Sequence, residues 1–209
     1  MMPLLTSSAV LGFATASFVI TICPGPSWIY TITAAVRQNG KAGLFAVMGN
    51  ATGICCHVTA AASGLAALMA VSPTAYGAVK WAGVCYVAWL GLRMLWNGPS
   101  LVVAGSLSSR TYWQVYRGGV LVNVLNPKVS ILMLALMPQF VDATRGSTTL
   151  QILLLGSVHG IIATAVLSIL VLIARRGVTA FQPVPLFSQL TRWGTGTILL
   201  LFSLKLAVG

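Results

Sequence analysis

The stretch SFVITICPGPSWIY, residues 17–30, decides the fold of this chain, because it places two prolines and a glycine deep inside an apolar run. The stretch GVLVNVLNPKVSI, residues 119–131, carries a similar break, Asn126-Pro127-Lys128, 102 positions after Pro24-Gly25-Pro26. Arg37 follows Pro26 by 11 residues and Asp142 follows Pro127 by 15 residues, which predicts that both breaks lie near the middle of a bilayer core about 30 Å thick. Proline removes a backbone hydrogen bond, and lipid cannot satisfy the groups left free. Paired breaks at this depth predict the binding site of a transporter.

The composition predicts a membrane protein. The chain is 57% hydrophobic and 6% charged, whereas soluble domains carry about 25% charged residues. Residues 1–36, 42–79 and 146–174 contain no Asp, Glu, Lys or Arg, and each stretch exceeds the roughly 20 residues that a membrane span needs. No Lys or Arg precedes the first hydrophobic run, so we expect a retained first span and not a cleaved signal peptide.

We predict an all-α membrane protein with six transmembrane helices in a single transporter domain, residues 1–209. Turn signals delimit spans at about 6–36, 42–70, 74–96, 113–141, 148–174 and 187–207. The longest connection divides the chain into repeat halves of about 1–98 and 110–209. Three spans per half give the halves opposite orientations, so the fold is predicted to be a 3+3 inverted repeat. Helices one and four are predicted to be broken at mid-membrane.

Cations are distributed unequally between the two sides of the predicted bundle. One side carries Arg37, Lys41, Arg93, Arg110, Arg117, Arg175, Arg176 and Arg192, and the other carries Arg145 and Lys205. Because cytoplasmic loops are enriched in Lys and Arg, both termini are predicted to lie outside the cytoplasm, in the periplasm of a bacterium.

The net charge of +11 does not predict a nucleic-acid partner, because the cations are spread singly over loops and helix ends, without a basic stripe. No carboxylate pair, nucleophile elbow, Walker loop or HExxH motif occurs, so we predict no enzyme activity and no cofactor. ATP-driven transport would need a separate subunit.

The first break predicts one part of a substrate site, made by Pro24, Gly25, Pro26 and Ser27. Free carbonyls on one side of an unwound segment can bind an ammonium group, and the new helix N-terminus can bind a carboxylate. The alternative is a structural kink whose free groups bond to neighbouring hydroxyls.

The second break predicts the other part of the site. Asn123 and Asn126 are three residues apart and are expected to share a helix face beside Pro127. Lys128 is a cation at membrane depth, which costs on the order of 2.5–3.5 kcal/mol and indicates function. A substrate carboxylate would supply its missing partner. Otherwise Lys128 bonds backbone carbonyls, snorkels or loses its proton.

The same offset of 102 residues relates His57 to His159, the two histidines of the chain. Either is a candidate for a proton relay, and the alternative is a buried neutral imidazole. A metal site built from His57, Cys56 and His159 lacks ligand spacing and carboxylates, so none is predicted, although a metal-ion permease or metal-resistance protein remains the alternative function. The cysteines are expected to be small buried hydrophobes: Cys23, Cys55, Cys56 and Cys85.

Span two carries the small-residue pattern Gly49-x-x-x-Gly53, which predicts close packing of helix backbones. Asn50 is a polar exception in this pattern and a candidate to face a cavity, as is Thr52.

An ordered set of motifs resembles the LysE/RhtB family of bacterial amino-acid exporters over nearly the whole chain. The motifs are Pro24-Gly25-Pro26, Gly40-x-x-Gly43, Gly49-x-x-x-Gly53, Gly64-Leu65-Ala66-Ala67-Leu68, Gly83-x-x-Tyr86-x-x-Trp89-Leu90-Gly91, Arg117-Gly118, Asn123-Val124-Leu125-Asn126-Pro127-Lys128 and Pro138-Gln139-Phe140. The resemblance implies a multi-pass inner-membrane protein that exports amino acids or close derivatives by secondary active transport, driven by the proton-motive force. Ser27 replaces an Asn that members often carry. Ile54 stands where many members have an acidic residue, which leaves His57, His159 and Lys128 as titratable candidates.

The charge count predicts the substrate class, because binding a dibasic amino acid usually needs a carboxylate in the pathway. No Asp or Glu lies at membrane depth, so we expect neutral zwitterions such as threonine, homoserine or branched-chain amino acids. The ammonium group would meet carbonyls at the first break, and the carboxylate would meet Lys128 or a half-helix N-terminus. Lipids and protons are the other expected partners, and a homo-oligomer is left open.

Overall fold

The computed structural model describes residues 3–65, 73–97, 110–175 and 185–208, and all regular structure within these ranges is helical. The first half contains α1 (Ser7–Ile22), α2 (Pro26–Arg37), α3 (Gly40–Ala60), the π-helical turn η1 (Ala61–Leu65) and α5 (Pro73–Asn97). The second half contains α6 (Tyr112–Val124), α7 (Pro127–Ile131), the π-helical η2 (Leu132–Leu136), the 3-10 turns η3 (Met137–Phe140) and η4 (Ala143–Arg145), α8 (Thr148–Arg175) and α9 (Pro185–Val208). The predicted end of span two, 66–70, lies outside the described residues, as does the cation Arg176.

Two segments of the described chain are long and apolar enough to cross a membrane as single helices, Gly40–Gly64 and Thr148–Arg175. Two bent pairs raise that number to four if each counts as one span. Ser7–Ile22 and Pro26–Arg37 meet at 55°, and Tyr112–Val124 and Lys128–Phe140 meet at 53°. The helices α5 and α9 occupy predicted ranges, but their role as spans stays a prediction.

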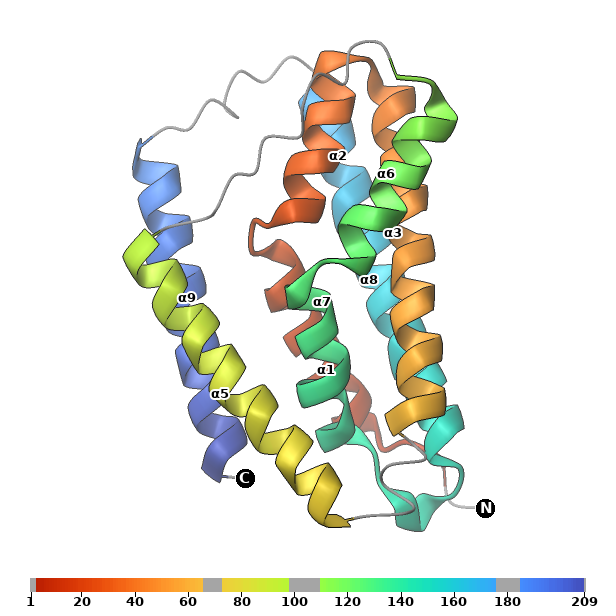
Figure 1. The fold of residues 1–209 in the computed structure, drawn as a ribbon, viewed down its shortest axis with the longest axis vertical. Coiled ribbons are helices and arrows are strands. Elements are labelled where there is room, and N and C mark those ends of the chain that lie inside the picture. The colour runs from red at the N-terminus through yellow and green to blue at the C-terminus, as the bar shows by residue number, and fades with distance from the viewer. Residues whose placement is uncertain (1–2, 66–72, 98–109, 176–184, 209) are drawn as a thin grey trace.

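Successive long segments run in alternating directions (Figure 1). The α1–α2 pair ascends in this view, α3 descends, and α5 ascends beside the bundle. The α6–α7 segment then descends, α8 ascends and α9 returns, so both termini lie at the lower end. The helices α5 and α9 pack on one another, and η2 links α5 to the remaining bundle.

Side-chain caps mark where several helices begin. The Thr6 hydroxyl accepts from the amide of Ala9 at the start of α1, and Asn39 Oδ1 accepts from Ala42 at the start of α3. Thr111 and Gln114 form a reciprocal capping box at the start of α6. These bonds satisfy amides that lack an intrahelical partner, so local sequence fixes these boundaries.

The interior has separate apolar clusters. One cluster, called the lower cluster, joins α1, α3, α8 and the η2–η3 segment, and includes Phe13, Ile54, Leu132, Met137 and Leu155. The upper clusters include Tyr30, Ala34, Ala46 and Val115, with Val47, Leu167 and Val171 on the α8 side. On α3, the buried amide of Asn50 lies between residues of the upper clusters and residues of the lower cluster. The buried amides of Asn123 and Asn126 occupy the same place in the segment from α6 to α7. A polar layer therefore separates the two apolar regions.

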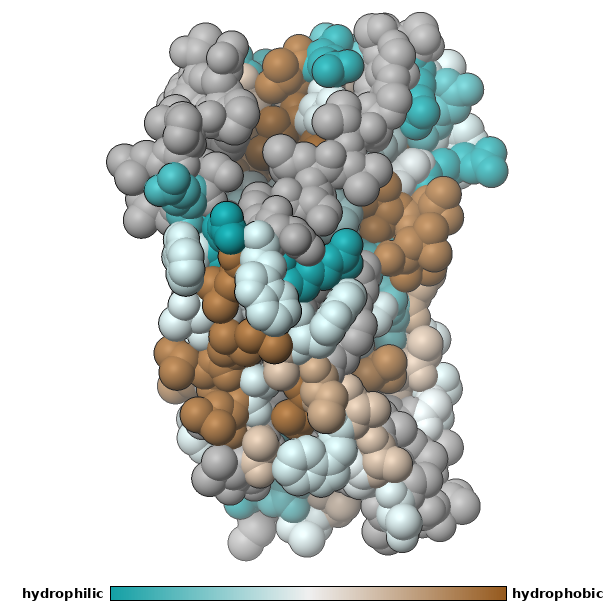
Figure 2. Space-filling model, turned by 60° about the vertical axis from the view of Figure 1, so that its left-hand side comes forward, coloured by the Kyte–Doolittle hydropathy of each residue, from teal (hydrophilic) through white to brown (hydrophobic). Residues whose placement is uncertain are grey.

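Large apolar side chains also cover the outside of the described helices. Leu11, Leu121, Ile161 and Leu201 are each at least 59% exposed. Figure 2 shows apolar residues over the middle of one face, with hydrophilic residues gathered towards its upper end. Lipid accommodates such a surface, whereas water would penalise apolar patches of this extent.

Candidate functional site

The first helix break is the three-residue segment between α1 and α2. Cys23 is buried and extended, and Gly25 is the N-cap of α2 with φ −164°. Pro26 is the first residue of α2, a position at which an amide would have no helical partner. The helix therefore stops and restarts with a new direction.

The second break has the same design with Asn in place of Gly. Helix α6 ends at Val124, and Asn126 caps α7 by accepting from the amide of Lys128 at 3.1 Å. Pro127 is the first residue of α7. The expectation that Asn123 and Asn126 share a helix face is wrong, because the helix ends between them and their amides bond to different helices.

The two breaks contact each other through side chains of the second. Lys128 Nζ donates to the carbonyl oxygen of Cys23 at 2.5 Å, and Asn126 Nδ2 donates to Ser27 Oγ at 3.2 Å. A Cβ on Gly25 would lie 3.3 Å from Lys128 Nζ, so the absence of a side chain leaves room for the ammonium group. Thus Lys128 bonds a backbone carbonyl, which was the alternative to a substrate anion.

A second polar contact joins α3 to α6 within the same layer. Asn123 Nδ2 donates to Asn50 Oδ1 at 2.8 Å, and both side chains are buried. His57 Nε2 bonds the backbone carbonyl of Asn123 at 3.1 Å. A carbonyl oxygen only accepts, so this nitrogen carries a proton. Gly53 gives Asn123 its space, because a Cβ there would lie 2.6 Å from Asn123 Cβ.

His159 approaches the layer from α8 and is 2% exposed. Its Nδ1 lies 2.6 Å from Ser17 Oγ on α1. Its Nε2 is buried and has no hydrogen-bond partner in the described part of the chain, and the same holds for the hydroxyl of Thr21, one turn after Ser17. Sequence reasoning missed Ser17 and Thr21. Their spacing of four residues, ending beside the Pro24 break, was the available signal.

The layer contains polar groups without a counter-ion. The single acidic residue of the chain, Asp142, lies in the loop before α8. Asn123 Oδ1 is a buried acceptor without a partner in the described ranges. The arrangement offers donors at Lys128 and Thr21 and an acceptor at Asn123, which suits a small molecule of mixed charge.

The structure offers no support for the metal alternative in the described residues, because no three His, Cys, Asp or Glu side chains are grouped there. The expectation of buried cysteines holds for Cys23 but is wrong for Cys55, Cys56 and Cys85, which are exposed. A thiol behaves as a small hydrophobe, so a lipid-facing position accommodates it as well as a core does.

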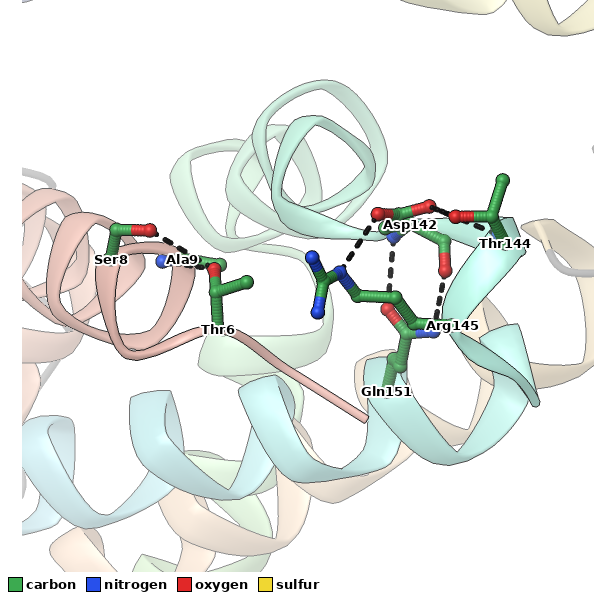
Figure 3. Close-up of polar contacts among 7 residues, drawn as sticks. All are labelled: Thr6, Ser8, Ala9, Asp142, Thr144, Arg145 and Gln151. Atoms are coloured by element: carbon green, nitrogen blue, oxygen red, sulfur yellow. Dashed lines mark hydrogen bonds and ion pairs between the residues drawn. The ribbon is translucent and has the colours of Figure 1, made fainter. Parts of the chain in front are cut away.

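Asp142 organises a polar cluster at the end of the bundle that holds the N-terminus (Figures 1 and 3). Its carboxylate accepts from the hydroxyl and amide of Thr144 at 2.6 and 3.0 Å and pairs with Arg145 at 3.0 Å. These bonds lower the pKa of Asp142 below its ordinary value, and the bond from the Thr144 hydroxyl has the largest effect. Gln151 bonds both the amide and the carbonyl of Asp142, which ties the loop to α8.

Helices with an apolar outer surface and a buried polar layer define a multi-pass membrane protein. The chain belongs to the LysE type translocator family, which matches residues 18–209.

Curated relatives cover different parts of the chain. An uncharacterized membrane protein of Vibrio cholerae is 30% identical over 65% of this chain and 66% of its own length. A homoserine/homoserine lactone efflux protein of Salmonella typhimurium is 28% identical over 60% of this chain and 61% of its own length. A leucine efflux protein of Enterobacter sp. (strain 638) is 25% identical over 91% of this chain and 89% of its own length. No solved structure matches the chain.

Proposed function

We propose that this protein exports neutral amino acids or close derivatives across the bacterial inner membrane by alternating access, driven by protons. The observation that carries the proposal is the contact of Lys128 with the Cys23 carbonyl, where the two helix breaks meet. The printed names of the Salmonella and Enterobacter relatives, efflux proteins for homoserine and leucine, support the substrate class.

The Lys128 contact supplies a way to couple binding to movement. An ammonium group that is partly withdrawn from water needs a partner, and here a neutral carbonyl holds it. A substrate carboxylate is a stronger partner, because its negative charge adds a coulombic attraction to the ammonium group that a neutral carbonyl lacks. Substrate binding would therefore release the first break from the second and free α1–α2 to move relative to α6–α7.

The ammonium end of a zwitterion needs acceptors close to that carboxylate site. The Cys23 carbonyl becomes available once Lys128 leaves it, and Asn123 Oδ1 is buried without a partner among the described residues. A second positive charge on the substrate would find no carboxylate in this described layer, so lysine and arginine are disfavoured.

The alternating directions of the helices support the remaining parts of the proposal. The α1–α2 and α6–α7 pairs run in opposite directions (Figure 1), as an inverted repeat of halves 1–98 and 110–209 requires. The two single spans and the two bent pairs make four spans, and α5 and α9 would bring the number to six. His57 and His159 are the candidates for proton transfer, and His159 has an unpartnered ring nitrogen in the described layer.

Uptake into everted membrane vesicles tests this function. With a proton gradient imposed, vesicles containing the protein should accumulate threonine, homoserine or leucine, and an uncoupler should abolish the accumulation. A clear preference for lysine or arginine would contradict the substrate class. Cells fed dipeptides provide the second measurement, since overexpression should lower the intracellular level of the released neutral amino acid.

A further inference from the structure

We propose that the outer face of α6 holds an anionic phospholipid at the membrane interface. This helix turns Val115, Gly119 and Asn123 inward, and they are buried. The opposite face borders a groove of about 890 Å³, lined by residues from Arg110 to Val124 and by Thr52 of α3. Neither Lys128 nor Cys23 lines this groove, and the groove has no part in the proposed transport step.

The groove changes character along the helix axis. Arg110 and Arg117 line the part near the start of α6, together with Trp113 and Tyr116. The part nearer the membrane centre is apolar and includes Leu121 and Val124. Cations and aromatic rings thus share the first part of the groove and aliphatic side chains follow, an arrangement that suits a lipid headgroup at the membrane interface and its acyl chain.

Trp113 and Tyr116 form an aromatic pair that suits the membrane interface. The rings of Trp113 and Tyr116 are stacked with centroids 5.2 Å apart and planes 16° apart. The Tyr116 hydroxyl lies 2.9 Å from Thr52 Oγ1, which fixes the tyrosine against α3. Trp113 remains 62% exposed. The stacked pair therefore forms a rigid wall beside the two arginines.

The charge of the groove selects an anion. The Arg117 side chain is exposed and makes no ion pair or hydrogen bond with the described residues, and Arg110 lines the same groove. Asp142 pairs with Arg145 at the opposite end of the bundle (Figure 1). A phosphate diester supplies the missing negative charge and matches the planar donors of arginine. A second copy placed here with two-fold symmetry would bring arginines together without a carboxylate between them.

The experiment uses the full chain in detergent, titrated with phosphatidylglycerol, with phosphatidylcholine of the same acyl chains, or with inorganic phosphate. Native mass spectrometry counts bound lipid, and thermal unfolding reports stabilisation. We expect phosphatidylglycerol to bind and stabilise, and the other two probes to fail. Arg117→Gln should weaken phosphatidylglycerol binding about fivefold, the usual contribution of one interfacial cation. Arg37→Gln, which removes a charge outside the groove, should bind as the wild type does.

Several outcomes overturn the assignment. If Arg117→Gln binds phosphatidylglycerol as well as the wild type does, the lipid is attracted by the overall positive charge of the protein and not by the groove. The same holds if Arg37→Gln weakens binding as much as Arg117→Gln does. Stabilisation by inorganic phosphate as strong as that by the lipid would make the groove a site for soluble anions. A lipid-free dimer that Leu121→Ala dissociates would assign the face to a second copy. The comparison of the three probes on the wild-type chain decides the matter even if a variant fails to fold.

Discussion

Lys128 is the residue whose substitution tests the proposed mechanism most directly. Its side chain is partly buried, and its ammonium group is held by one carbonyl oxygen from the other break. A purely structural cation would be replaceable by an apolar side chain of similar length, because replacing a buried charge in this way is often neutral for stability. A cation that binds the substrate could not be replaced in this way without loss of transport.

Lys128→Met should therefore leave the amount of folded protein in the membrane near that of the wild type and reduce transport by at least about tenfold, the cost of losing one partner of a buried charge contact. Vesicle uptake of threonine or leucine measures the loss. Lys41→Met is the control, because Lys41 lies over the ring of Tyr112, away from the breaks. Wild-type transport by Lys128→Met would refute the role of this ammonium group.

Gly53 tests the packing that positions Asn123. A Cβ at Gly53 would lie 2.6 Å from Asn123 Cβ and 2.8 Å from Asn123 Oδ1. Gly53→Ala should lower the free energy of unfolding by about 1–3 kcal/mol through overpacking, and transport should fall because Asn123 is displaced. Gly160→Ala is the matched control. Its nearest atom would be Ile54 Cγ2 at 3.9 Å, so it should be neutral or stabilise by up to about 1 kcal/mol. Thermal unfolding of both variants checks the difference.

At the scale of elements, the two breaks use the same arrangement, a helix that restarts with proline as its first residue. The residue before each proline differs, however. Gly25 has no side chain and leaves room for Lys128, whereas Asn126 caps α7 and also bonds Ser27 of the other break. The Asn126 side chain thus caps the start of α7 and joins the two breaks.

Asn126→Ala removes both the cap of α7 and the hydrogen bond to Ser27 that joins the two breaks. Asn39→Ala removes only a cap, that of α3. Each variant should lose about 1 kcal/mol of stability, the usual cost of an N-cap. Only Asn126→Ala should also lose transport. Thermal unfolding and vesicle uptake measured on both variants separate the two effects, and equal transport by the pair would make the contact with Ser27 unimportant.

The loop before α8 should give the protein a particular response to acid. The hydrogen bonds from Thr144 lower the pKa of Asp142 in the folded state, so the folded protein holds this carboxylate in its charged form. The resulting stabilisation is present above the unfolded value near about pH 3.9 and is lost as pH falls through the lower folded value.

The unfolding temperature of the detergent-solubilised chain, followed from about pH 6 down to about pH 3, should fall in the acidic part of this range. Asp142→Asn should weaken that fall, and Asp142 is the only acidic side chain in the sequence. Arg145→Gln is the comparison, because it keeps the stronger bonds from Thr144. An unchanged acid response in Asp142→Asn would assign the response to other groups.

At the scale of the whole molecule, the alternating helices place both termini at one end of the bundle and the start of α6 at the other (Figure 1). The distribution of Lys and Arg then predicts which end faces the cytoplasm. The cations near the ends of α2 and α8 and near the start of α6 belong to the cytoplasmic side in this prediction.

Reporter fusions test the orientation. Alkaline phosphatase joined to the C-terminus of the full chain should be active, because it would reach the periplasm, and a fluorescent protein at the same place should stay dark. Fusions made after Arg37 should give the reverse pattern. A bright C-terminal fluorescent fusion would contradict the predicted orientation.

The sequence by itself determined the helical class and the positions at which helices stop and restart around Pro24-Gly25-Pro26 and Asn126-Pro127-Lys128. These features depend on local physics, since proline cannot continue a helix hydrogen-bond pattern and long uncharged stretches need lipid. The spacing of the breaks also indicated that Lys128 and Ser27 belong to one region, although it did not predict their partners.

Only the tertiary structure decided which groups meet. It placed Lys128 on the Cys23 carbonyl, joined His159 to Ser17, and separated Asn123 from Asn126 by ending a helix between them. It also turned Cys55 and Cys56 outward. Such contacts depend on the rotation of each helix about its axis and on the packing of residues distant in sequence, neither of which is encoded in a local pattern.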